Sequence, residues 1–208
     1  MILGIDHLAY NVCDMETAQK ELEAKQYRCV FKELQLQNPI AKRPVLESFQ
    51  PVHDIAYFIR PGAVPIEITH HHSRYADNTG PYDIQDNFIF LSCKNLSEET
   101  DFWIRAFGLI LISETQLQLN SPLPGRGGTI QLQQKTERKP STLDGRGYTC
   151  LALLGKGTAA AADRIRKAGG DTITDPFEMT VNSKRLNISL HKSPSGALIE
   201  LLELKNNF

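Results

Sequence analysis

His7 and Glu67 are residues of types that could bind a metal ion, and each lies in a strand-like stretch. Residues 5–12 and 64–69 are rich in strand-forming residues, and alternate residues of a strand share a face. The apolar neighbours would pack beneath helices, which leaves His7 and Glu67 on the opposite face. An unpaired buried carboxylate is costly, so we expect a cation or an open, solvated cleft beside Glu67.

Gln131 has a similar position, because Ile130 and Leu132 alternate with it along residues 129–133. A histidine combined with carboxylate or amide oxygens and water suits Zn²⁺, Mn²⁺, Co²⁺, Ni²⁺ or Fe²⁺. The same side chains could instead line a metal-free binding cleft. The residue pattern leaves both interpretations open.

Several other polar residues are candidates for substrate binding. Asn11 shares a strand face with His7, and Arg60 lies beside a turn where it could meet an anionic group. Lys42-Arg43 could do the same, although a solvated loop explains both basic positions. The run His70-His71-His72 is most simply a solvated exit from a strand into a linker, with a supplementary ligand role for His71 as the alternative.

The elements that would position these residues repeat three times in the order β-α-β-β-β. The first pass has a helix at 15–25 and strands at 5–12, 27–34, 54–59 and 64–69. The second has a helix between the Asn95 cap and Gly108 and strands at 88–93, 109–113, 116–119 and 129–133. The third has a helix capped by Thr158 and strands at 148–154, 172–174, 186–191 and 198–204.

The repeat predicts an α+β fold whose curled mixed sheets surround a cleft. The three βαβββ units would span residues 1–72, 87–135 and 147–208, with polar linkers at 73–86 and 136–146. One such unit buries its sheet face poorly, so we expect units to pair.

Composition narrows the range of partners. The formal net charge of −1 gives no reason to expect nucleic acid or an anionic membrane. No apolar run approaches the ~18 residues of a membrane span, and the first residues lack the pattern of a signal peptide. The four cysteines form no CxxC pair, which is typical of free thiols in a reducing compartment. We therefore expect a cytoplasmic protein that binds a small-molecule substrate.

Two segments resemble the vicinal oxygen chelate superfamily, which includes glyoxalase I, methylmalonyl-CoA epimerase, extradiol dioxygenases and bleomycin- or fosfomycin-resistance proteins. They are IDHLAYNVCDMETAQKELEAKQY at residues 5–27, nearest to the glyoxalase and epimerase branch, and SPSGALIELLE at residues 193–203. The middle unit resembles the family mainly through the repeat. The resemblance implies that two units pair around a cleft, so the surplus unit, whichever of the three it is, could pair with its counterpart in a second chain to form a homodimer.

In that superfamily metal ligands come from the first and last strands of the paired units. The resemblance therefore implies His7, Glu67, Gln131 and Glu200 as ligands of a divalent ion. The position that matches His7 falls on Phe88, or Asn87, in the second unit and on Thr149 in the third, and neither phenylalanine nor threonine is a typical ligand. Pairing of units one and two would give His7, Glu67 and Gln131, whereas pairing of units one and three would give His7, Glu67 and Glu200.

Three functions remain open from the sequence. The first is a metal-dependent lyase or isomerase in which Glu67 or Glu200 abstracts a proton from a small 2-oxo or thioester substrate and the metal stabilises an enediolate. The second is a metal-free protein that binds a small molecule or an antibiotic. The third is an extradiol-type dioxygenase, which would need a second histidine ligand.

Overall fold

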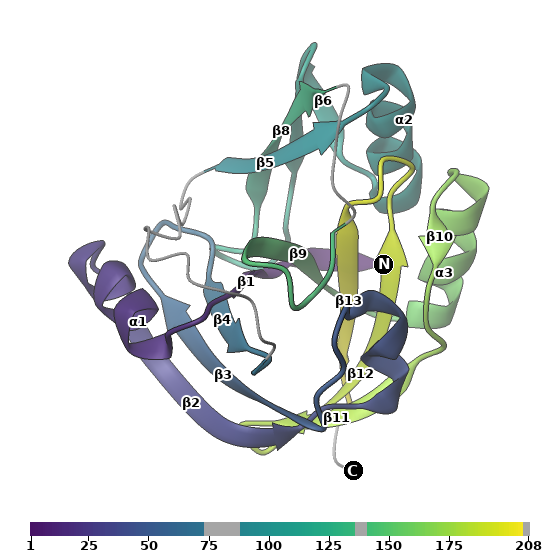
Figure 1. Cartoon of the computed structure of the whole chain (residues 1–208). Coiled ribbons are helices and arrows are strands. Elements are labelled where there is room, and N and C mark those ends of the chain that lie inside the picture. The colour runs from purple at the N-terminus through teal and green to yellow at the C-terminus, as the bar shows by residue number, and fades with distance from the viewer. Residues whose placement is uncertain (73–87, 136–140, 206–208) are drawn as a thin grey trace.

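The computed structural model describes residues 1–72, 88–135 and 141–205, which form three successive units (Figure 1). The first two have the order βαβββ, and the third has one more strand after its helix. The first unit contains β1 (Ile2–Asn11), α1 (Met15–Ala24), β2 (Arg28–Gln37), the 3₁₀ helix η1 (Ile40–Val45), β3 (Val52–Ile59) and β4 (Ile66–His70). The second contains β5 (Phe88–Cys93), α2 (Leu96–Phe107), β6 (Ile110–Ser113), β7 (Gln116–Leu119) and β8 (Gly128–Gln134). The third contains β9 (Gly147–Gly155), α3 (Thr158–Lys167), β10 (Asp171–Thr172), β11 (Phe177–Val181), β12 (Lys184–Lys192) and β13 (Leu198–Leu204).

Units one and three share one sheet, and unit two forms a separate one. The larger sheet runs β10-β12-β13-β9-β1-β4-β3-β2, with β11 paired to β12, and the smaller runs β5-β8-β7-β6. Antiparallel pairing of β1 with β9, with Leu8 opposite Leu151, joins the two units. The expected α+β fold is therefore confirmed, and the pairing of units that the sequence left open is that of one with three.

The larger sheet curls until its two ends meet, as Figure 1 shows for β2 and β11. The backbone N–H of Asn182 donates to Glu33 Oε1 at 2.8 Å, and Leu36 of β2 packs beside Met179 of β11. This closure joins the two outer edges of units one and three. It turns the inner face of the sheet into the wall of a cavity.

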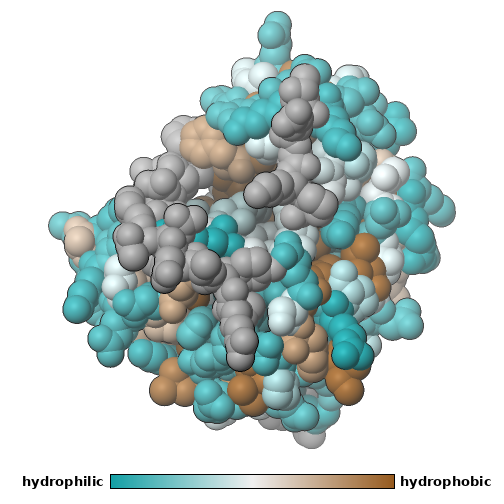
Figure 2. Space-filling view, viewed as in Figure 1, coloured by the Kyte–Doolittle hydropathy of each residue, from teal (hydrophilic) through white to brown (hydrophobic). Residues whose placement is uncertain are grey.

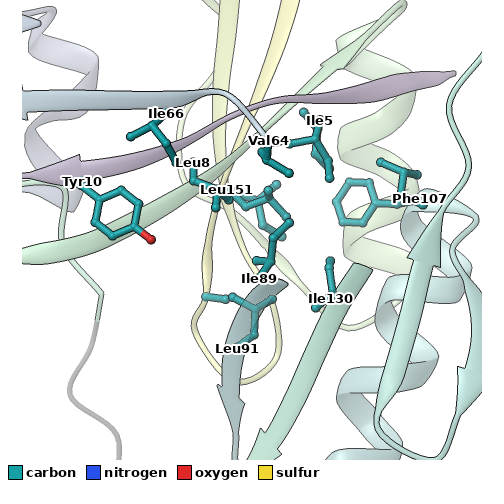
Figure 3. Packing of buried hydrophobic residues seen from close by; sticks show 14 of the residues in the cluster. Ile5, Leu8, Tyr10, Val64, Ile66, Ile89, Leu91, Phe107, Ile130 and Leu151 are labelled. Carbon is teal, nitrogen blue, oxygen red and sulfur yellow. The ribbon is translucent and has the colours of Figure 1, made fainter. Parts of the chain in front are cut away.

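The main core lies where the two sheets face each other. Figure 3 shows Ile5, Leu8 and Leu151 of the larger sheet directed toward Ile89 and Ile130 of the smaller one. These side chains are at most 2% exposed, so each removes most of its apolar surface from water. The alternation expected for β1 is confirmed, because Leu8, with Tyr10 and Val12, packs in this core while His7 does not.

Helix ends follow the local sequence in two of the three helices. Asn95 Oδ1 accepts the backbone N–H of Glu98 at the start of α2, and Gly108 ends that helix at φ 75°. In α3 the expected Thr158 cap is wrong, since Gly157 occupies the cap position without a side-chain bond. The carboxylate of Glu203 on β13 instead accepts the N–H of Gly157 at 2.7 Å.

The strand boundaries differ from expectation in the loops. β2 continues to Gln37, and the loop after it contains η1, where only an irregular segment was expected. The strand β11 was not predicted, although its residues, FEMTV, alternate between apolar and polar side chains. The predicted linker 73–86 and residues 136–140 of the second linker lie outside the described residues, and residues 141–146 form a turn over the cleft side of β9.

Hydrophilic residues dominate the face shown in Figure 2, and hydrophobic residues form separate patches on it. Among the helices that the structure describes, none is both long and apolar enough to cross a membrane.

Candidate metal centre and cavity

A cavity of about 210 Å³ opens on the inner face of the larger sheet. It contains His7, Glu67 and Glu200, which come from β1, β4 and β13, the strands at the centre of that sheet. The rest of the wall includes both polar and apolar side chains. Its other lining residues are Asp6, Val30, Phe31, Lys42, His53, Ile55, Tyr57, Arg126, Leu154, Met179, Val181, Asn182, Lys184, Leu186, Ile188, Leu202 and Leu204.

The His7 imidazole lies between two carboxylates from different units. Its Nε2 is 3.6 Å from Glu67 Oε1 and 3.8 Å from Glu200 Oε2, and His7 is only 3% exposed. This nitrogen is buried and has no hydrogen-bond partner in the described part of the chain. A buried nitrogen without a partner, facing two carboxylate oxygens, is a donor set that fits a divalent cation.

Electrostatics show how strongly this place favours positive charge. Burial disfavours a charged imidazole, but the attraction of Glu67, Asp6 and Glu200 outweighs it and raises the pKa of His7 to about 9. Burial, together with repulsion from Glu200, raises the pKa of Glu67. Without a metal, a proton on His7 therefore supplies the positive charge between the carboxylates. A bound cation would replace that proton.

Asp6 orients the histidine from behind. His7 Nδ1 donates to Asp6 Oδ2 at 2.9 Å, since the carboxylate can only accept, and this directs Nε2 into the cavity, where loss of its proton would free it to bind a metal. Neighbouring residues of a regular strand point to opposite faces, but β1 has a bulge here, with Ile5 opposite Leu153 and His7 opposite Ala152. The bulge brings Asp6 to the cavity side. Alternation along the sequence could not have found this partner.

Unit two contributes Arg126 to the same wall. Its guanidinium donates to Asp6 Oδ1 at 3.0 Å and to the Asp6 carbonyl at 2.6 Å, and it holds the pKa of Asp6 down together with His7, against the effect of burial. Tyr57 also donates to the Asp6 carbonyl, at 2.9 Å, and its ring meets His7 edge-on. The role of Arg126 depends on long-range packing against β1, which the sequence alone does not reveal.

Lys42 of η1, like Arg126, brings a positive charge to the cavity wall. The residue is 8% exposed, and no hydrogen bond or ion pair joins its ammonium to another described residue. Burial and then the charge of Lys42 lower the pKa of His53 to about 2 and that of His71 to about 3. These two stacked imidazoles are therefore neutral beside it. A solvated loop was the simpler explanation of Lys42 from the sequence, but the structure buries most of this side chain.

The other predicted site residues lie elsewhere. Gln131 is on β8 of the smaller sheet, where its side chain accepts from Gln116 at 2.9 Å, and it does not line the cavity. Asn11 donates to the Asp144 carbonyl at 2.8 Å and thereby fixes the turn at the end of the second linker. Arg60 donates to the Lys25 carbonyl and lies over the Tyr27 ring. The structure brings together only His7, Glu67 and Glu200.

Strand register corrects the assignment of the vacant ligand position in unit three. In unit one Ala9 lies beside Glu67, and in unit three Ala152 lies beside Glu200, so Ala9 and Ala152 are equivalent. His7 is two residues before Ala9, and its counterpart two residues before Ala152 is therefore Cys150. Thr149 was the wrong residue by one position, and its hydroxyl donates to the Ala9 carbonyl. Cys150 is fully buried in a cluster with Val45 and others, which separates its thiol from the cavity.

We predict that Asp6→Asn weakens binding of Zn²⁺ or Co²⁺ by roughly 10–100-fold, because the carboxylate behind His7 increases its basicity and fixes its orientation. Isothermal titration calorimetry of the metal-free protein would measure the change. Asp101→Asn is the matched control, since Asp101 is exposed and its described ion pair is with Arg105. Equal affinities in the Asp6 variant and the wild type would show that Asp6 does not support a metal site.

Comparison with known proteins gives structural neighbours only. No protein-family model and no curated protein matches the chain. Glyoxalase I from Zea mays is 16% identical, with a TM-score of 0.43 over 96% of this chain and 67% of that one. A hypothetical protein from Bacillus halodurans is 11% identical, with a TM-score of 0.47 over 98% and 96%. At these identities the comparison concerns the fold alone, and nothing about activity follows.

Proposed function

We propose that this protein is a metal-dependent lyase or isomerase of the vicinal oxygen chelate type, acting on a small oxygenated substrate. The observation that carries the proposal is the buried, unpartnered His7 Nε2, 3.6 Å from Glu67 and 3.8 Å from Glu200. These three residues would hold the metal. A bound divalent ion would act as a Lewis acid toward two neighbouring substrate oxygens.

The surroundings of Glu67 suit proton transfer. Burial and repulsion from Glu200 raise the pKa of Glu67, which makes it a stronger base than an ordinary carboxylate. Both side chains face the same small space, so a substrate carbon held there lies within reach of either one. We assign proton abstraction next to a carbonyl to Glu67 or Glu200.

Lys42 supports an anionic oxygen on the substrate. Lys42 is 8% exposed, and its ammonium has no hydrogen-bonding partner among the described residues, so an anionic oxygen entering the cavity would stabilise it. Leu186 and Leu202 in the cavity wall would accept a short apolar group. A cavity of about 210 Å³ is below the ~300–1,000 Å³ that is usual for drug-sized ligands, which favours a small 2-oxo acid or similar metabolite.

One observation favours a second candidate, a metal-free binding protein. The fourth ligand position of the paired units holds Cys150, which is buried away from the cavity, so the chain itself supplies three ligands. An open position is also what a catalytic metal needs for water or substrate. The two candidates therefore differ in whether ligand binding depends on the metal.

Proton exchange tests this proposal. Small 2-oxo acids, hydroxyketones and thioesters would be incubated in D₂O with the protein and Co²⁺, Mn²⁺, Ni²⁺ or Zn²⁺, and loss of the proton next to the carbonyl followed by ¹H NMR. We expect exchange with at least one compound class, abolished by a chelator and reduced by Glu67→Gln or Glu200→Gln. Glu178→Gln is the control, because Glu178 is exposed and contacts Arg185 and Lys205.

Each outcome has a defined meaning. A variant that keeps the metal but loses exchange identifies the base. Ligand-induced thermal stabilisation that is unaffected by chelator and by His7→Ala would contradict the metal-dependent enzyme and favour the binding protein.

A further inference from the structure

A second group of metal-ligating side chains lies on the opposite face of the larger sheet. Asp54 of β3 and His70 of β4 are cross-strand partners. Alternation places His53 and Ile55 in the cavity wall, so Asp54 between them points to the other face. On β4, His70 is three residues after Glu67. An odd spacing along a strand places two residues on opposite faces, so His70 faces away from the cavity. This group is therefore separate from His7, Glu67 and Glu200.

The backbone brings a third ligand to the same place. His72 follows the end of β4 with φ 52°, a left-handed conformation that is uncommon for a residue with a side chain. Its ring lies against that of His70, with centroids 4.3 Å apart. Because a nonglycine residue adopts this conformation only at a cost, the turn that returns His72 toward His70 is consistent with a functional constraint.

The ligand atoms converge on one carboxylate oxygen. Asp54 Oδ1 accepts the backbone N–H of Gln35 at 2.8 Å, which fixes the carboxylate. Its Oδ2 lies 3.4 Å from His72 Nε2 and 3.9 Å from His70 Nδ1, and the three ligand atoms are within 4.8 Å of one another. The His72 Nε2 is buried and makes no hydrogen bond within the described ranges.

These separations suit a small divalent ion. Metal–ligand bonds of ~2.0–2.2 Å in a tetrahedral site place neighbouring ligand atoms about 3.3–3.5 Å apart. The distance from Asp54 to His72 already has this value, and that to His70 needs a shift of about half an ångström. The side chains are 12%, 28% and 32% exposed for Asp54, His70 and His72, so an ion could enter and water could complete its shell.

We infer that Asp54, His70 and His72 form a second site for a divalent transition metal such as Zn²⁺, held by two imidazoles and one carboxylate. This site is independent of the proposed function, because it shares no ligand with the cavity. It ties the ends of β3 and β4 together on the outer face, and bound metal would stabilise the folded chain in proportion to its affinity.

Metal stoichiometry tests the second site. Metal-free protein would be titrated with Zn²⁺ by calorimetry, with expected values of two equivalents for wild type, one for His72→Ala or Asp54→Asn, one for His7→Ala, and none for His7→Ala combined with His72→Ala. His191→Gln is the control and keeps two equivalents, since His191 bonds to Ser189 and Thr172. Unchanged stoichiometry in His72→Ala and Asp54→Asn would overturn the inference and indicate a histidine–aspartate ion pair only.

A measurement on the unaltered protein guards against variants that fail to fold. Long-range ¹H–¹⁵N spectra of the histidine rings would be recorded during the Zn²⁺ titration, and His70 Nδ1 and His72 Nε2 should shift. No shift at either nitrogen at saturating Zn²⁺ would overturn the second site. A loss of stoichiometry with His72→Ala but not with His7→Ala would instead support the second site and contradict the proposed function.

Discussion

Replacing His7 with alanine should weaken binding of Zn²⁺ or Co²⁺ in the cavity by more than about 100-fold. Removing a residue that only supports a metal ligand typically weakens metal binding by roughly 10–100-fold. His7 would bind the metal directly and is the only nitrogen donor among the three converging side chains, so its loss should cost more. A 100-fold loss corresponds to about 2.7 kcal/mol of binding free energy. Calorimetry on a background of His72→Ala, which removes the proposed second site, would isolate this value.

The stability of metal-free His7→Ala and one further variant, Glu200→Gln, separate loss of a metal ligand from damage to the fold. His7→Ala leaves Glu67 and Glu200 buried near each other without a cation, so the metal-free variant should also be less stable. Glu200→Gln keeps the side-chain volume, lowers the negative charge and should weaken metal binding while raising the stability of the metal-free protein. If neither variant changes affinity although both remain folded, His7 and Glu200 are not ligands.

The second large effect is expected in the core, where Trp103→Ala should lower the free energy of unfolding by about 3–5 kcal/mol. Trp103 on α2 is fully buried, its ring packs against Phe102 and Phe107, and its indole N–H donates to Glu99 at 3.0 Å. The substitution leaves both a void and a buried carboxylate with one fewer donor. Urea unfolding followed by circular dichroism is suitable, because the variant lacks the chain's one tryptophan.

Ile104→Ala is the matched control for this change. Ile104 is the next residue of the same helix and is 36% exposed, so its truncation should cost well under half as much. Trp103→Phe should fall between the two, because it keeps most of the ring volume and loses the bond to Glu99. Equal losses for Trp103→Ala and Ile104→Ala would contradict the packing described for unit two.

Local patterns in the sequence predicted the elements and one face of the site well. Alternation in residues 5–12 and 64–69 placed His7 and Glu67 on the cleft side, and both line the cavity. Glu200 joined them only through the family resemblance, because the strand that carries it is apolar on both sides. Such a strand gives no alternation from which to infer a face.

Features that depend on pairing between distant strands were not predictable. Whether Gln131 or Glu200 meets His7 depends on which unit pairs with the first, and no local pattern contains that choice. Likewise Thr149 and Cys150 differ by one position, which only the register of β9 with β13 resolves.

The sequence did not predict Asp6, Arg126 or the burial of Lys42, because irregular local geometry determines their positions. A bulge turns Asp6 to the face of its neighbour, and Arg126 reaches it from 120 residues away. Lys42 lies in a polar, proline-containing loop of the kind that is usually solvated, yet η1 buries it. Bulges and loop placement depend on tertiary packing, which composition and periodicity do not describe.

Anomalous scattering from crystals grown with Co²⁺ or Zn²⁺ tests the central claim most directly. Data collected on both sides of the metal absorption edge would locate the ion without reference to any substrate. We predict a peak in the cavity within bonding distance of His7 Nε2 and of carboxylate oxygens of Glu67 and Glu200. A fully formed cavity with no peak there at saturating metal would contradict the proposal that this protein is a metal-dependent enzyme.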